Sequence, residues 1–261
     1  MKNAIKLLAF TLFILTFYSC SNDDTSTDLS GNGNLVLKFD NIYNLNDFAF
    51  NTPYTNSNGE VIKANKLKYI VSNIRLTKED GSLFIIPKSE SLFIVNEANS
   101  ESTFITLQNI PAANYTGVTF GIGVDQAQFS TGADGQGNFL ALAQTENMLW
   151  SWAAGYKFLV FEGVFTTATN STENPFRIHT GQTSVSYNYT EKQLDLTTKA
   201  LVRQTITPQI HIMADFKYIL DGANKNDLVN ANGGDIMGGA KLTDISNNIP
   251  DMFSVHHVHN D

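Results

Sequence analysis

The sequence predicts an all-β protein, folded as a single β-sandwich or barrel-like domain with a few short helices. Two observations predict this class. Short segments in which apolar and polar residues alternate recur along most of the chain, and turn-forming residues separate them. Helical spacing of apolar residues is confined to two short segments. Many short strands at regular spacing are typical of a sandwich or barrel.

The first predicted strand, residues 34–39, places three apolar side chains on one face. Residues 67–86 read as two strands joined by a Glu-Asp-Gly turn at residues 79–81. In the segment 115–125, Gly121 and Gly123 predict a bulge or a close approach of another chain segment. Further strands are predicted at 91–97, 102–111, 155–167, 183–198 and 206–220.

The segment 206–220 alternates most clearly. One predicted face carries Ile210, Ile212, Ala214 and Phe216, and the opposite face carries His211, Met213 and Asp215. Short helices are predicted at 139–149 and from about residue 239 to the residue before Pro250.

The N-terminus predicts export. A basic start precedes an apolar run at residues 4–18, which is shorter than the about 20 residues that a spanning helix needs. Residues 1–19 therefore read as a signal peptide. The small residue before Cys20 resembles a bacterial lipoprotein signal, which implies that Cys20 is lipidated; the alternative is a plain signal peptide with an incidental cysteine.

Residues 20–33 are polar and read as a lipidated flexible tether, and residues 34–261 as one domain. The acidic pair Asp23-Asp24 resembles the export signals of surface lipoproteins in Bacteroidetes-type bacteria. We therefore expect a lipoprotein of the cell envelope, attached to the outer membrane through Cys20 and facing either the cell surface or the periplasm.

Composition excludes several functions. The formal net charge of −8 argues against nucleic acid as a partner, because nucleic-acid binding needs a basic footprint. Cys20 is the only cysteine, so the mature chain has neither an internal disulfide nor a thiol nucleophile. The sequence contains no G-x-S-x-G elbow, Walker loop or H-E-x-x-H motif. We therefore expect a binding protein and no catalytic residues.

The five histidines are the strongest functional signal. They are His179, His211, His256, His257 and His259. Without thiolates, imidazole and carboxylate ligands remain, and these suit copper or zinc. If the C-terminal chain is extended, His257 and His259 share a face and reach one ion; the alternative is a frayed terminus. Taken alone, His179 and His211 are more typical of ordinary hydrogen-bonded histidines.

The two tryptophans of the chain, Trp150 and Trp152, lie on one side of a predicted extended segment. By composition they read as core residues. In an alternative function, exposed Trp150 and Tyr156 form a stacking platform. The protein would then be a surface lipoprotein without a metal that binds a glycan, a peptide or a partner protein.

The chain also resembles the MbnP family of extracytoplasmic copper-binding proteins. The resemblance rests on the segments 67–82, 109–125 and 147–163, the last with the pattern W-x-W-x-x-G-Y-x-F-x-x-x-E-G, and on FRIHTG, IHIMADFKYIL and MFSVHHVH further on. In that family a di-haem enzyme of the MauG type oxidises a tryptophan to kynurenine, which then lies at a copper site with histidines.

The resemblance implies a role in copper acquisition, storage or handover. The implied copper ligands are His179, His211, His257 and His259, and the implied oxidation sites are Trp150 and Trp152. Asp125, at the end of a predicted strand, is implied as a ligand or as a residue that orients one; capping a turn is the alternative. The implied partner is a di-haem enzyme.

Overall fold

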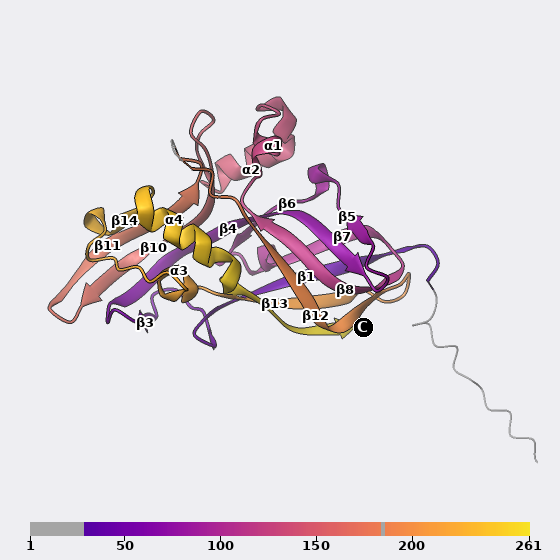
Figure 1. Ribbon diagram of the computed structural model, residues 1–261, viewed down its shortest axis with the longest axis horizontal. Helices are drawn as coiled ribbons and strands as arrows, with labels where there is room; N and C mark the ends of the chain where they lie inside the picture. Colours follow the sequence, from indigo (N-terminus) through magenta and orange to yellow (C-terminus); the bar gives the residue numbers. More distant parts are fainter. Residues whose placement is uncertain (1–28, 184–185) are drawn as a thin grey trace, which may run out of the picture.

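A computed structural model describes residues 29–183 and 186–261 of the chain (Figure 1). The predicted signal peptide, Cys20 and most of the tether lie outside the described residues. Within them the structure consists mainly of strands in two curved sheets, which confirms the predicted all-β class. No helix among the described residues is both long enough and apolar enough to cross a membrane.

The smaller sheet has five strands in the order β15-β13-β1-β2, with β7 also paired to β1. Strands β1 and β13 are parallel, whereas β13 and β15 are antiparallel. The alternation of β1 buries Leu35, Leu37 and Phe39, as expected. The bounds are β1 Asn32–Tyr43, β2 Asn46–Asp47, β7 Phe104–Pro111, β13 Pro208–Asp215 and β15 Phe253–Asn260.

The larger sheet has ten strands and follows the order β12-β8-β4-β10-β11-β14, with β3, β5 and β6 on β4 and β9 on β10. Strand β4 pairs with β10 along its first half and with β8 along its second. The bounds are β3 Pro53–Thr55, β4 Val61–Lys78, β5 Leu83–Ile85, β6 Leu92–Asn96, β8 Ala113–Ile122, β9 Leu149–Ser151, β10 Gly155–Thr167, β11 Asn170–Gly181, β12 Thr190–Val202 and β14 Asp235–Ile236.

Helices are short: α1 and α2 lie outside the sheets, whereas α3 and α4 pack against the main core (Figure 1). The α-helices are α1 Gln126–Phe129, α2 Asn138–Thr145, α3 Tyr218–Asp221 and α4 Gly239–Asn248. The 3-10 helices are η2 Lys88–Glu90, η3 Ser100–Thr103, η4 Asp134–Gln136, η5 Asn232–Gly234 and η6 Ile249–Met252. Helices α2 and α4 confirm the two predicted helical segments; α2 ends earlier than expected because β9 follows it.

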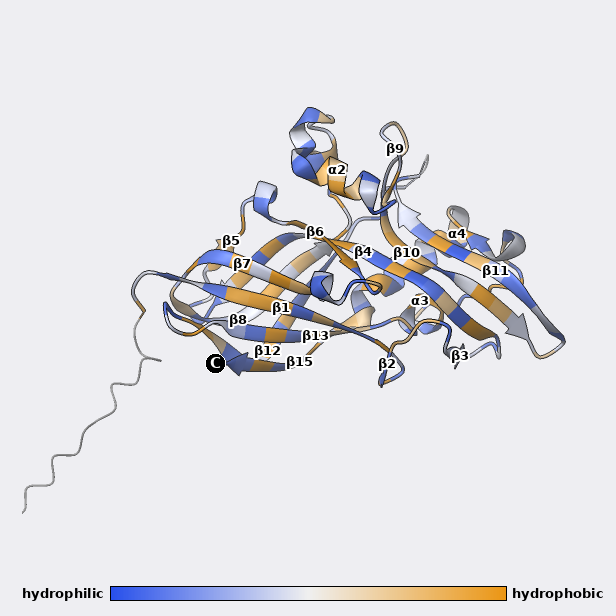
Figure 2. Ribbon diagram, turned by 180° about the vertical axis from the view of Figure 1, so that it is seen from behind, coloured by the Kyte–Doolittle hydropathy of each residue, from blue (hydrophilic) through white to orange (hydrophobic). Residues whose placement is uncertain are grey.

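The main core lies between the sheets, where apolar faces meet (Figure 2). Edge-to-face aromatic pairs hold it, including Phe39 against Phe120 at 5.5 Å between ring centroids and Phe120 against Phe253 at 5.2 Å. A second apolar cluster includes side chains of β10, α2 and the start of β9. Strand β10 contributes side chains to both cores, with Phe161 in the first and Phe158 in the second. Because both of its faces are buried, its apolar residues form a continuous run.

Two glycines at the end of β8 confirm the predicted close approach. At Gly121 an added Cβ would overlap the Tyr189 side chain, and at Gly123 it would overlap the Phe158 ring. Gly123 also has φ of +109°, a conformation that L-residues rarely adopt. Larger residues at these two positions would therefore push apart the packing between β8, β10 and the segment before β12.

Candidate metal centre

Three histidines meet on the outer face of the five-stranded sheet. One ring nitrogen each from His211, His257 and His259 lies within 4.8 Å of the others. The Nε2 atoms of His257 and His259 are 2.9 Å apart, and the rings of His211 and His257 stack at 4.1 Å between centroids. His211 is buried, His257 half-buried and His259 exposed, so the group opens from the sheet toward solvent.

Strand β13 supplies His211. Its Ile210 and Ile212 are fully buried in the core, so alternation turns His211 to the opposite face, as the sequence predicts. Strand β15 supplies the other two and pairs with β13, with His211 opposite His257 and Gln209 opposite His259. The C-terminal segment is therefore an ordered strand, and the alternative of a frayed terminus is wrong.

The end of β15 is also tied to the neighbouring sheet. The Asn260 side chain accepts a hydrogen bond from the Leu201 backbone N–H at 2.7 Å and donates one to the Lys199 carbonyl at 3.0 Å. Both residues belong to β12. The histidines thus stand on a strand that is held along one edge and at its end, which fixes their backbone positions.

A carboxylate orients the innermost imidazole. In the parallel neighbour β1, the Asp40 Oδ2 lies 3.2 Å from His211 Nδ1, and Lys38 Nζ pairs with Asp40 at 2.8 Å. The His211 Nε2 faces the Gln209 side-chain oxygen. A carboxylate on one ring nitrogen commonly fixes the tautomer of a metal-binding histidine and leaves the other nitrogen for the metal.

Burial and crowding favour the neutral form of two of these imidazoles. Burial, followed by repulsion from His257, lowers the pKa of His211 below its usual range. The pKa of His257 is lowered by burial and then by His256 and His259. Metals bind the neutral imidazole, so both shifts favour metal binding at neutral pH.

His179 lies in the other sheet, on β11, apart from these three. Its Nε2 is 2.7 Å from Glu162 Oε1, and Glu162 in turn pairs with Lys66 at 2.7 Å. Burial lowers the pKa of His179 even though Glu162 opposes the shift. Its Nδ1 is buried with no hydrogen-bond partner among the described residues. Of the four expected ligands, the structure brings together three and places His179 in a separate polar cluster.

The two tryptophans point to different neighbours. Trp150, on β9, lies 6.3 Å from the His179 ring and against the Gly181 backbone. Strand β9 ends at Ser151, so Trp152 begins the turn into β10 and packs on Phe129 at 4.8 Å. The expectation of one extended segment is wrong here, because the hairpin turns earlier than the sequence suggests. Figure 2 shows β9 far from β15.

Asp125 caps a helix. Its side chain accepts a hydrogen bond from the Gln128 backbone N–H at 3.0 Å, at the start of α1. Lys88 pairs with it at 2.7 Å, and the Asn73 amide donates to it at 2.9 Å. Burial alone would raise the pKa of Asp125, but these donors outweigh it and lower the pKa. These contacts match the turn-capping alternative for this residue.

The alternative function requires exposed Trp150 and Tyr156 as a stacking platform, and the structure exposes only part of Trp150. Tyr156 is only 1% exposed and packs within the second core, so it offers no face to a ligand. The expectation of an exposed Tyr156 is therefore wrong, because the Gly155 turn directs its ring inward. Trp150 is half-buried at the edge of a 400 Å³ depression that Gln182 and Met237 also line.

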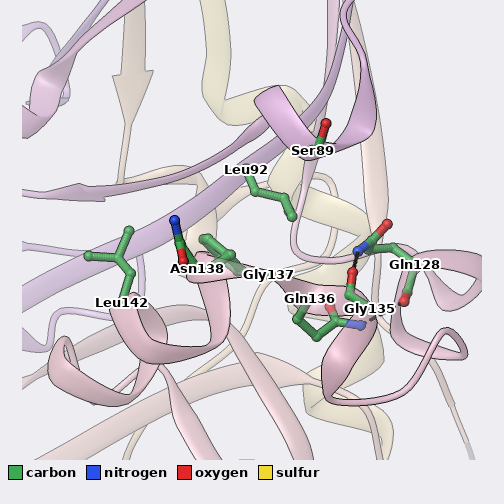
Figure 3. A pocket seen from close by; sticks show the side chains of 9 residues that line it. Ser89, Leu92, Gln128, Gly135, Gln136, Gly137, Asn138 and Leu142 are labelled. Carbon is green, nitrogen blue, oxygen red and sulfur yellow. Dashed lines mark hydrogen bonds between the residues drawn. The ribbon is translucent and has the colours of Figure 1, made fainter.

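A larger depression of 490 Å³ lies between η2, α1 and α2 (Figure 3). Two of its polar side chains, Gln128 and Gln136, form hydrogen bonds within the loop that forms it. Gln128 donates to the Gly135 carbonyl at 3.0 Å, and Gln136 donates to the carbonyls of Gln128 and Gly132 at 2.8 and 2.9 Å. These amides hold the loop together.

Sequence reasoning missed three residues of these clusters. Asp40 is 171 residues from His211, and Glu162 lies on the neighbouring hairpin strand 17 residues before His179, so only strand pairing and register reveal these contacts. His256 lies 2.7 Å from His257, between their Nδ1 atoms. The doublet His256-His257 within an alternating strand was a signal for it, since a doublet breaks the period of two.

Comparison with known proteins bears on this fold. The sequence model of the MbnP family matches residues 32–238, a range that includes His179, His211 and both tryptophans and ends before α4 and β15. No curated protein matches the chain. The chain is similar to the solved structure of MbnP from Methylosinus trichosporium, with 11% identity, a TM-score of 0.46, and coverage of 79% of this chain and 81% of that one. Because the family model matches well over half of the sequence, this chain belongs to the MbnP family.

Proposed function

We propose that this protein binds copper through His211, His257 and His259, and that it acquires, stores or hands over the ion at the cell envelope. The observation that carries the proposal is the convergence of three imidazoles on the open face of a sheet. The proposed role is binding without catalysis. Membership of the MbnP family supports copper as the ion.

The chemistry of the donor set fits copper. Imidazole nitrogens bind copper and zinc, and a given nitrogen site holds copper(II) more tightly than zinc(II). Metal-bound imidazole nitrogens lie about 2.0 Å from the ion and so about 3 Å from each other. The Nε2 atoms of His257 and His259 are 2.9 Å apart and already have this spacing. His211 Nε2 faces the Gln209 side-chain oxygen, so the His211 ring must rotate toward the other two to bind the same ion.

Copper titration of purified variants tests this proposal. The wild type should bind about one copper per chain, and His211→Ala, His257→Ala and His259→Ala should each weaken binding by at least about tenfold. His179→Gln is the matched control: it removes an imidazole outside the cluster and should leave the affinity unchanged. A wild type that binds no copper, or three alanine variants with wild-type affinity, would refute the proposal.

We also propose that Trp150 is the tryptophan that a di-haem partner enzyme oxidises to kynurenine. Its indole lies 6.3 Å from the ring of His179, whose Nδ1 has no hydrogen-bond partner among the described residues, whereas Trp152 packs on Phe129. Two oxygen atoms from the oxidant that the haem enzyme uses cleave the indole ring to N-formylkynurenine. Water then hydrolyses the formyl group, which leaves as formate and gives kynurenine. The aryl amine that results would then have a hydrogen-bond acceptor in His179.

Mass spectrometry of protein from the native host tests this second proposal. Fragmentation should place a mass gain of about 4 Da on Trp150 and none on Trp152. A gain on Trp152, or an unmodified peptide from cells that contain the haem enzyme, would refute it. The unmodified peptide would instead favour the alternative of a surface protein that binds a glycan, peptide or partner without a metal. The proposed location requires a lipid on Cys20. The mass of the same intact protein shows whether that lipid is present.

A further inference from the structure

His256 adds a fourth imidazole to the outer face of the sheet, and the proposed three-histidine cluster does not use it. Its Nδ1 lies 2.7 Å from the Nδ1 of His257, with the ring centroids 4.6 Å apart. On the other edge of the His257 ring, Nε2 faces His259 Nε2 at 2.9 Å. Both nitrogens of His257 therefore face another imidazole nitrogen.

A β-bulge explains how His256 reaches this face. The pairing of β15 with β13 shifts between His257 opposite His211 and Val255 opposite Ile212, so His256 is the extra residue. Without His256 the strand would alternate regularly, with Phe253, Val255 and Val258 inward and His257 and His259 outward. The bulge thus adds one outward imidazole while the other side chains keep their faces.

The spacing of the His256 and His257 nitrogens is that of two ligands of one ion. Ligands about 2.0 Å from copper or zinc and at right angles to each other are about 2.8 Å apart. The measured 2.7 and 2.9 Å on the two edges of His257 both match this value. His256 is exposed, so an ion held on that edge would complete its coordination with water.

We propose that His256 and His257 form an outer copper position through which the ion enters and leaves the three-histidine cluster. This inference rests on the proposed copper-binding function. The ion passes from Nδ1 of His257, beside the exposed His256, to Nε2, beside His259 and the buried His211. No electron is transferred. The single ring proton of His257 moves through water from Nε2 to Nδ1, so one copper occupies the two positions in turn.

Stopped-flow transfer of copper(II) from its complex with 4-(2-pyridylazo)resorcinol tests the proposal. His256→Ala should bind the same amount of copper with the same dissociation constant, because the inner cluster is intact. Loading should be slowed by at least about tenfold, since the outer position loses one of its two ligands. Release must then slow by the same factor, because the dissociation constant is the ratio of the two rates.

A deletion of His256 separates the imidazole from the bulge. The deletion restores a regular strand with His257 and His259 still outward, and it should load copper as slowly as His256→Ala. Wild-type loading by His256→Ala would overturn the proposal, whatever the deletion does. Failure of the copper site itself is distinguishable, since the wild type would then bind no copper or His211→Ala would keep its affinity.

Discussion

At the scale of single residues, the candidate site depends on side chains that hold imidazoles in one tautomer. Asp40 faces His211 Nδ1 at 3.2 Å and is itself paired with Lys38. Glu162 plays a similar part for His179, where it faces Nε2 at 2.7 Å. A neutral histidine has one donor nitrogen and one acceptor nitrogen, so such a carboxylate decides which nitrogen remains available to a metal.

Asp40→Asn should weaken copper binding without changing the number of ions bound. The amide accepts a weaker hydrogen bond from His211 and can also donate one, so the ring loses its fixed tautomer. Partners of this kind are commonly worth about 10- to 100-fold in metal affinity. Competition titration measures the effect, with the exposed Asp47→Asn on neighbouring β2 as control. Equal affinities for the two variants would contradict the assigned role of Asp40.

Copper affinity should resist mild acidification. The pKa values of His211 and His257 are lowered, so at the usual histidine pKa of about 6.5 the neutral form of each imidazole predominates. Affinity should therefore be nearly constant from neutral pH to about 6.5 and fall at lower pH, where protons compete with the metal. Dissociation constants for copper measured across this pH range test the predicted change in affinity. A steep loss beginning above pH 7 would contradict it.

At the scale of elements, the hairpin of β9 and β10 depends on contact with the end of β11. Gly181 permits this contact: an added Cβ would lie 2.5 Å from the Tyr156 carbonyl oxygen and 2.8 Å from Trp150 Cζ3. Gly181 directly follows Thr180 and lies two residues from His179. The position of Trp150 beside His179 therefore depends on the absence of a side chain at residue 181.

Gly181→Ala should destabilise the protein and displace Trp150. The backbone atoms that meet the new Cβ cannot move as a flexible side chain can, so we expect a loss of about 1–3 kcal/mol in the free energy of unfolding. Denaturant unfolding and tryptophan fluorescence measure the two effects. Gly238→Ala is the control, because an added Cβ there meets nothing within 4 Å. Equal stability of both variants would argue against close packing at Gly181.

At the scale of the whole molecule, the proposed copper site joins β13 to β15, the C-terminal strand of the sheet. Strand β13 lies between β1 and β15, so an ion bound by His211, His257 and His259 links the C-terminal edge strand to the interior of the sheet. Asn260 fastens the same edge strand to β12 of the other sheet. Copper binding should therefore stabilise the contact between the two sheets.

Copper should raise the thermal stability of the intact protein. A ligand at a hundred times its dissociation constant adds about 2.7 kcal/mol to the free energy of unfolding. In a domain of this size that corresponds to a rise in Tm of about 5–10 °C. Calorimetry with and without copper measures it. His211→Ala should show a smaller rise, about half for a tenfold weaker affinity. An equal rise in that variant would place the stabilising ion elsewhere.

Much of the local structure followed from periodicity. Alternation in 206–220 predicted that His211 faces away from the core, and the glycines at 121 and 123 predicted a close approach; both are confirmed. The same reasoning failed where a single residue changed the direction of the chain. The early turn at Trp152 and the bulge at His256 each depend on contacts that a period of two does not describe.

The sequence by itself determined the class of the fold, the family, and the outward face of His211 and of the pair His257 and His259. The tertiary structure decided which of these faces meet. His211 and His257 come together because β13 and β15 pair, and Asp40 joins them because β1 lies parallel to β13. His179 is kept apart because β11 belongs to the other sheet. Alternation is a local property of the backbone, whereas the choice of neighbouring strand depends on burying the whole core at once.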